Sequence, residues 1–338
     1  MALASSAAVA QESLLFTRNA RSLHGVYSPL LVKGLAHACL ALPPLADSPA
    51  CNPALNDLES EPRLSILGNL SNGYVNLSSF YALSNGQLEA DLSKRIFDEN
   101  NPLLQVEANG ALVFFSKALA IRYIPVDLNA YLVARNEANP QVEIGYVQSH
   151  VGEIQGGLRI TRDLRAGLRL QGGQRQALFT RFQLLTPVIP TTTTSWFVNV
   201  EPGLAYEFAR VAWSPRVGFM LANLKYENIK QPRIGAPIDP QIGVSVSPPL
   251  PWGELSIEVA LRRLSEEADF WRRPRLGALY RFGALSVSAG VDRDGLSLGF
   301  LSRFGNLNTG ILFASTRSVF ESTDFFTQTL YLEAGWTF

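Results

Sequence analysis

The chain ends on Gln328-Thr-Leu-Tyr-Leu-Glu-Ala-Gly-Trp-Thr-Phe338, in which apolar and polar residues alternate up to an aromatic last residue. Side chains alternate across a β-strand, so this period of two predicts an amphipathic terminal strand. The face that carries the last residue also holds Trp336, Ala334, Leu332 and Leu330. Chain ends are usually poorly ordered, and a strand at this position therefore indicates that its backbone has a partner strand.

The same alternation recurs from Arg63 onward in segments of about ten residues that turn residues separate. It is clear in Gly157–Thr161 and Leu164–Gln171, which flank the tight connection Arg162-Asp163, and again in Glu254–Arg262. The sequence Asp292-Arg-Asp-Gly295 carries an Asp-Gly pair, a strong signal for a hairpin turn. The region therefore consists of many antiparallel strands joined by turns.

Composition excludes several classes of protein. Of the 338 residues, 47% are hydrophobic and only 17% are charged, below the roughly 25% of an ordinary soluble domain. Basic and acidic residues balance at 29 each, so no net field attracts nucleic acid. No run of about 18 apolar residues is present, which excludes a protein that spans a membrane with helices.

Alternating strands also fit a soluble sandwich, but the strands are too numerous for any second layer in the sequence to cover. Their polar faces carry isolated charges, Gly and Ser, as expected for the lumen of a membrane barrel. At roughly ten residues per strand plus connections, residues 63–338 hold about 14 strands, with a range of about 12–14. We therefore predict an all-β fold, a single antiparallel transmembrane β-barrel. Phe282 and Phe304 end two of its strands where an aromatic girdle is expected.

The terminal stretch resembles the C-terminal signature of bacterial outer-membrane barrels. In these proteins a terminal Phe on an amphipathic last strand is read by the barrel-assembly machinery. The resemblance implies a location in the bacterial outer membrane, with the assembly machinery and outer-membrane lipid as partners. The residues that carry it are Phe338, Trp336, Leu332 and Leu330.

The N-terminal segment has no sustained period. Residues 1–10 end in Ala8-Val9-Ala10 and resemble the remnant of a secretory signal peptide; the alternative is a small-residue tail. Residues 11–62 are rich in Pro and Gly and are expected to form irregular backbone. Cys39 and Cys51 are the two cysteines of the chain, and export favours a disulfide between them over two buried thiols.

The stretch Ala46-Asp-Ser-Pro-Ala-Cys-Asn-Pro-Ala-Leu55 resembles the motif that FadL-like outer-membrane transporters and their PorV-type relatives carry ahead of the first strand. Its core is Asn52, Pro53 and Ala54; the spacing is shorter than usual, and Ser48 replaces an Asp. The bland alternative is an ordinary Asn-Pro turn. The resemblance implies a 14-stranded barrel with residues 11–62 as a hatch in the lumen. It also implies either sideways passage of small hydrophobic molecules into the membrane or the binding of a partner protein.

Charged residues on polar strand faces are expected to point inward, because charge that faces lipid is costly. We predict that they form a lumenal polar network that holds the hatch; the alternative is a polar conduit. The predicted members are Arg159, Arg165, Arg169, Glu254, Glu258, Arg262 and Glu333.

Catalytic and metal chemistry find little support. The histidines are His24, His37 and His150, and the neighbouring Ser149 and His150 would point to opposite faces of a strand. No cluster has metal-ligand spacing, so we predict no catalytic residue, no metal and no cofactor. The preferred function is passive, FadL-like transport with a small hydrophobic ligand. The alternative is a PorV-like, non-enzymatic accessory barrel that binds a partner or secreted protein.

Overall fold

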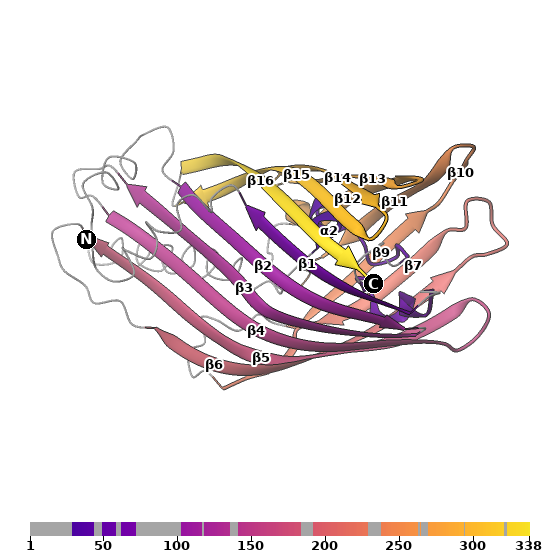
Figure 1. Ribbon diagram of the computed structural model, residues 1–338, viewed down its shortest axis with the longest axis horizontal. Coiled ribbons are helices and arrows are strands. Elements are labelled where there is room, and N and C mark those ends of the chain that lie inside the picture. The colour runs from indigo at the N-terminus through magenta and orange to yellow at the C-terminus, as the bar shows by residue number, and fades with distance from the viewer. Residues whose placement is uncertain are drawn as a thin grey trace.

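The protein is a closed β-barrel of fourteen antiparallel strands in a computed structural model (Figure 1). The structure describes residues 29–43, 49–58, 62–71, 103–116, 118–135, 141–183, 192–228, 238–262, 264, 270–293, 295–320 and 323–338. The predicted signal remnant, residues 1–10, and Ala46–Ser48 of the motif lie outside these ranges. No helix within the described ranges is long and apolar enough to cross a bilayer.

The strands follow one another around the ring in chain order. They are β1 (Arg63–Ser71), β2 (Leu103–Ser116), β3 (Leu119–Arg135), β4 (Gln141–Arg159), β5 (Leu164–Gln183), β6 (Thr193–Glu207), β7 (Arg216–Ala222), β9 (Asp239–Val246), β11 (Gly253–Leu261), β12 (Pro274–Phe282), β13 (Leu285–Asp292), β14 (Gly295–Phe304), β15 (Leu307–Phe320) and β16 (Thr323–Thr337). Two short strands extend neighbours: β8 (Leu224–Glu227) pairs with β6, and β10 (Pro249–Leu250) pairs with β11.

The ring closes between the first and the last strand. β16 pairs antiparallel with β1 from Thr337 opposite Ser65 to Tyr331 opposite Ser71, and the Phe338 amide donates to the Leu64 carbonyl at 2.9 Å. Along β16, Leu332, Trp336 and Phe338 are exposed, whereas Tyr331, Glu333 and Thr337 are buried. The predicted lipid-facing closing strand is thus confirmed as a structural element.

The described strands alternate in the same way around the ring. In β6 the side chains of Trp196, Val198 and Leu204 are exposed, while Phe197 and Asn199 between them are buried. We call the end of the barrel that holds the turns at 160–163, 283–284 and 305–306 the short-turn end. Exposed aromatic side chains gather there: Phe282, Phe304, Trp336 and Phe338. They match the girdle expected at a membrane interface.

The described part of the N-terminal segment lies inside the barrel. It comprises the helix α2 (Leu30–Gly34) and the 3-10 helix η1 (Pro53–Leu58), with a disulfide joining Cys39 to Cys51 at an S–S distance of 2.07 Å. Its side chains are buried against the wall, among them Leu35, Leu40 and Leu55, each 0% exposed. We call residues 29–43 and 49–58 the hatch.

The hatch backbone approaches the wall closely because a belt of glycines faces it. A Cβ on Gly167 would lie 2.2 Å from the carbonyl carbon of Pro53, and one on Gly290 would lie 2.3 Å from the Ala36 nitrogen. At further positions a Cβ would also come within 3.1 Å of a hatch atom, namely at Gly157, Gly203, Gly218, Gly243 and Gly277. Cross-strand partners among these glycines form three sets: Gly157, Gly167 and Gly203; Gly218 and Gly243; and Gly277 and Gly290. Because glycine has no side chain, the hatch backbone packs directly against the backbone of the wall at these positions.

The lumen beside β1–β4 is lined by apolar side chains of the wall. Phe115, Ile124 and Val151 belong to one buried apolar cluster with Leu67 and Phe197, and each of the first three is 0% exposed. The glycine contacts of the hatch therefore lie on strands from β4 to β15, and inward apolar residues line the lumen beside β1–β3.

We expect Gly167→Ala to destabilise the barrel by about 2–3 kcal/mol, because the new methyl group meets hatch backbone that cannot rotate away. Unfolding by denaturant in detergent micelles measures the change. Gly152→Ala is the matched control on the neighbouring strand, since its Cβ would come no closer than 3.9 Å to the Gly172 carbonyl oxygen across the ladder. That control is expected to stay within about 0.5 kcal/mol of the wild type; an equal loss in both variants would contradict close hatch packing.

Deletion of Phe338 is expected to reduce insertion into the outer membrane of a producing cell while leaving refolding in detergent nearly unchanged. The deletion removes one backbone hydrogen bond, to Leu64, at the end of the β1–β16 ladder. Heat-shifted gel mobility of membrane fractions and of refolded protein gives both quantities. A parallel loss in the two preparations would show that Phe338 acts through stability and not through recognition by the assembly machinery.

Candidate functional site

Two wall carboxylates hold the hatch by its backbone N–H groups. Glu258, on β11 and 0% exposed, accepts from the Leu40 amide at 2.6 Å and from the Ala41 amide at 2.9 Å. Glu333, on β16, accepts from the Leu30 amide at 2.9 Å. These N–H groups stabilise the buried carboxylates, because a hydrogen bond to a charged acceptor is stronger than one between neutral groups. Both residues were predicted from the sequence to face the lumen.

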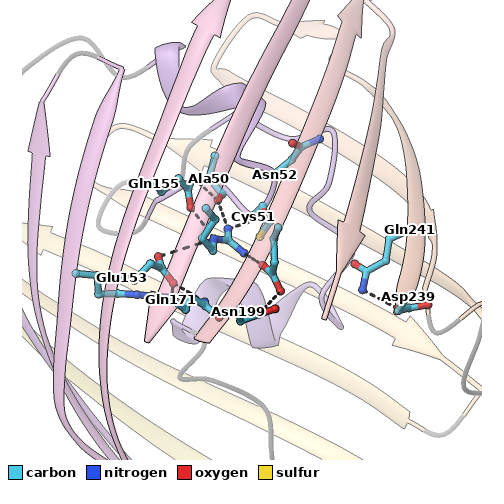
Figure 2. A network of polar contacts seen from close by, with 12 residues as sticks. Ala50, Cys51, Asn52, Glu153, Gln155, Gln171, Asn199, Asp239 and Gln241 are labelled. Atoms are coloured by element: carbon cyan, nitrogen blue, oxygen red, sulfur yellow. Dashed lines mark hydrogen bonds and ion pairs between the residues drawn. The ribbon is translucent and has the colours of Figure 1, made fainter. Parts of the chain in front are cut away.

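Wall arginines hold the hatch by its backbone carbonyls. Arg169 Nη2 donates to the Ala50 carbonyl at 2.9 Å and to the Cys51 carbonyl at 2.7 Å; Figure 2 labels these two hatch residues. Arg262 Nη1 donates to the His37 carbonyl at 2.7 Å. Because these bonds go to main-chain atoms, the hatch is recognised by its path and less by its side chains.

Asn52 is the side chain by which the motif binds the wall. Its Nδ2 donates to the Leu204 carbonyl at 2.9 Å, and its Oδ1 accepts from the Ala54 amide at 3.0 Å. The residue is 0% exposed, and Pro53 next to it opens η1. The predicted Asn52, Pro53 and Ala54 core therefore forms an ordered turn that is tied to β6.

Arg165 of β5 links the hatch to β6 at the short-turn end. It lies 3.1 Å from Asp57 of η1 and 2.8 Å from Glu207 of β6, and its side chain is 2% exposed. Glu207 in turn binds Arg216 at 3.1 Å. Asp57, Glu207 and Arg216 were not predicted, because they lie at element ends where strand alternation carries little information.

Two predicted members of the lumenal network lie elsewhere. Arg159 is exposed where β4 ends, and the Glu254 side chain is 78% exposed and 3.7 Å from Arg281. Both residues are on the correct strands, but they sit at the short-turn end beyond the hatch. The prediction was wrong for these two because alternation predicts the face of a residue and not its height in the barrel.

Above the hatch, further from the short-turn end, buried charges are paired across the wall. Arg122 binds Glu153 at 2.6 Å, and Arg169 binds Glu201 at 2.8 Å. Gln171 and Asn199 connect these pairs, since Gln171 donates to Glu153 at 2.6 Å and Asn199 donates to Gln171 at 3.1 Å (Figure 2). Within the described residues, no group of three or more His, Cys, Asp or Glu is arranged to hold a metal ion.

The wall is irregular at one place in β3. The register with β2 shifts between Gly110 and Leu112, and the register with β4 shifts between Ile124 and Asp127. Both shifts fall around Pro125, so β3 carries one extra residue relative to each neighbour, which defines a β-bulge. The Pro125 carbonyl is within hydrogen-bonding distance of Nδ1 of His150, an exposed residue of β4. His150 thus satisfies a carbonyl that the bulge takes out of the ladder.

No family model matches the sequence, and no curated protein matches it significantly. Solved structures do. The toluene transporter TbuX of Ralstonia pickettii superposes with a TM-score of 0.52 at 11% identity, over 92% of this chain and 98% of its own. The toluene transporter TodX of Pseudomonas putida gives 0.53 at 7% identity, over 92% and 97%.

A third likeness, to a FadL homologue of Pseudomonas aeruginosa, has a TM-score of 0.44 at 10% identity over 92% of this chain and 98% of that one, and adds no weight. At these identities the comparisons establish the fold. Together with the apolar outer face, that fold supports a location in the bacterial outer membrane. The chain therefore has the fold of the FadL-like outer-membrane β-barrels.

Proposed function

We propose that the protein carries small hydrophobic molecules passively across the outer membrane, by a route that leaves the barrel sideways. The observation that carries the proposal is the bulge at Pro125, in a wall whose short-turn end is blocked by a firmly held hatch. The fold shared with two toluene transporters supports it. The outer-membrane lipid then receives the passenger directly.

A route through the short-turn end would require the hatch to leave. Its removal would strip Glu258 of two hydrogen bonds and Arg169 of two more, in a lumen where these groups are mostly buried. An uncompensated buried charge costs several kcal/mol. The disulfide between Cys39 and Cys51 further ties together the two described parts of the hatch. A sideways exit with the hatch in place therefore costs less free energy than a route that requires the hatch to leave.

The bulge suits an exit because Pro125 has no N–H to give to a ladder. Closing the wall around it relies on regular pairing above and below, and on the contact with His150. The exposed neighbours Tyr123 and Val126 present apolar surface to the lipid. A hydrophobic passenger that parts the wall here meets hydrocarbon and not water.

The chain divides, in this proposal, into a signal remnant at 1–10, a hatch segment at 11–62 and a barrel at 63–338. Phe338, with Trp336, Leu332 and Leu330 on the same face, serves as the address that the assembly machinery reads. We infer no catalytic residue, since Ser149 is buried and His150 is exposed on opposite faces of β4.

An accessory barrel that binds a partner protein is the second candidate. The firmly held hatch favours it, because a sealed lumen is compatible with a purely structural or docking role. Such a protein would have no use for a bulge that interrupts both ladders of β3. Co-purification of a stoichiometric protein partner, with no uptake of hydrophobic molecules, would favour this candidate.

Deletion of Pro125 tests the transport proposal. The deletion restores one-to-one pairing of β3 with both β2 and β4, because each register shift amounts to one residue. Uptake of labelled toluene by Gram-negative cells that produce the full chain is expected to fall by about fivefold or more once the bulge is gone. Folded barrel, measured by heat-shifted gel mobility, is expected to remain at the wild-type level.

Pro202→Ala provides the matched control, because Pro202 lies in β6 opposite Leu168 in an unbroken register. It is expected to leave uptake unchanged. Equal uptake by the wild type and the Pro125 deletion would refute an exit at the bulge. Uptake by the wild type no greater than that of cells without the chain would refute transport altogether.

A further inference from the structure

We propose that the passenger is an amphiphile with an uncharged hydrogen-bonding headgroup, such as a hydroxyl on an aromatic body, and not a bare hydrocarbon. The inference rests on the proposed function and specifies its substrate class. It follows from how the inner surface is layered directly behind the bulge in β3.

From β1 to β6, the inward residues level with the bulge are all polar. Six inward residues are successive cross-strand partners from β1 to β6, and each is 7% exposed or less. We call them the polar arc: Asn69, Asn109, Asp127, Ser149, Arg175 and Ser195. A passenger that leaves the lumen at Pro125 passes Asp127, two residues further along β3.

Hydrogen bonds connect neighbouring members of the polar arc. Asn109 Nδ2 donates to Asn69 Oδ1 at 2.8 Å in one orientation of its amide and to Asp127 Oδ1 at 2.7 Å in the opposite orientation. Arg175 Nε donates to Ser149 Oγ at 3.3 Å. These groups exchange partners readily with a hydroxyl, which both donates and accepts. A methyl group in the same place would leave some of them without a partner, at a cost in binding.

The cations around the polar arc are already paired with carboxylates. Arg175 lies 3.7 Å from Glu227, which also binds Lys225, and Lys33 of the hatch binds Glu107. Tyr331 donates to the same Glu107 at 2.9 Å. An anionic headgroup would have to break one of these pairs and leave a buried carboxylate without its cation. A neutral headgroup avoids that cost.

The next layer toward the hatch is apolar, and it suits the body of an amphiphile. Leu67, Ile124, Val151 and Phe197 form one cluster beneath the polar arc. The Phe197 ring lies 4.8 Å from the Arg175 guanidinium and 4.9 Å from the Lys225 ammonium, so cations border the apolar layer. A ring on the apolar layer places its substituent at the polar arc.

A buried hydrogen-bond acceptor in the layer below the apolar cluster also favours a passenger that carries a hydroxyl. Asn199 is 5% exposed and donates to Gln171 and to Glu201, at 3.1 and 3.0 Å, while its Oδ1 accepts no hydrogen bond from the part of the chain that the structure describes. Buried polar atoms in native proteins usually have a partner. The hydroxyl of a passenger is a donor of the kind that this oxygen lacks.

Phenol and toluene are the matched probes, since they differ by a hydroxyl in place of a methyl group; benzoate adds the charged case. The full chain in lipid nanodiscs is titrated with each by calorimetry, with empty nanodiscs subtracted. We expect phenol to bind about tenfold more tightly than toluene, the size of one net hydrogen bond. Benzoate is expected to bind at least about tenfold more weakly than phenol.

The double substitution Ser149→Ala with Ser195→Ala removes both hydroxyls of the polar arc and little volume. It is expected to reduce the preference for phenol to about threefold or less while leaving toluene binding unchanged. Ser288→Ala is the control, since Ser288 is a buried serine of β13, against the hatch and away from the polar arc.

Tighter binding of toluene than of phenol by the wild type would overturn the substrate class and leave the transport proposal standing. An unchanged preference in the double variant would overturn the role of the polar arc, and tight benzoate binding would overturn the neutral headgroup. Absence of saturable binding by all three probes would overturn this inference as well. The uptake experiment with the Pro125 deletion judges transport independently.

Discussion

A bilayer offers no water to backbone groups, and this constraint shapes the whole chain. Each strand must find two neighbours, so the last strand has to meet the first. The ladder from Thr337 opposite Ser65 to Tyr331 opposite Ser71 meets that requirement, and the Phe338 amide adds one further bond. The alternating polarity of residues 328–338 follows from the same constraint, because the outer face of this strand contacts lipid while its backbone stays paired.

The same constraint acts on the hatch, whose irregular backbone cannot use a ladder. Wall side chains take the place of strand partners: Glu258 accepts two of its amides, and Arg169 donates to two of its carbonyls. Long side chains can reach across a gap, but glycines are needed where no gap remains, as at Gly167 against Pro53. The inner wall is therefore complementary to the hatch backbone. Charged side chains bind it where there is a gap, and glycines allow direct contact where there is none.

Alternation was enough to predict the barrel, the closing strand and the inward face of Glu258, Arg169 and Glu333, because lipid and lumen select side chains at every second position. It did not predict height, and so Arg159 and Glu254 were assigned to the lumen although they lie at the short-turn end. Nor does it indicate which backbone atom a lumenal charge will bind. The bulge did leave a signal, the proline in Tyr123-Ile-Pro-Val-Asp127, since proline inside a strand often marks a bulge.

The wall does not share the hatch evenly. The charged side chains that bind hatch backbone belong to β5, β7, β11, β12, β16 and the residue following β11, and none of these bonds comes from the described residues of β3. Beside β3 the lumen holds apolar side chains such as Phe115 and Ile124, together with the pair of Arg122 and Glu153 that the wall makes within itself. Apolar contacts lack direction and re-form after small shifts, while a buried ion pair or charged hydrogen bond does not tolerate them. The bulged strand can thus move without breaking any of the charged bonds that hold the hatch backbone.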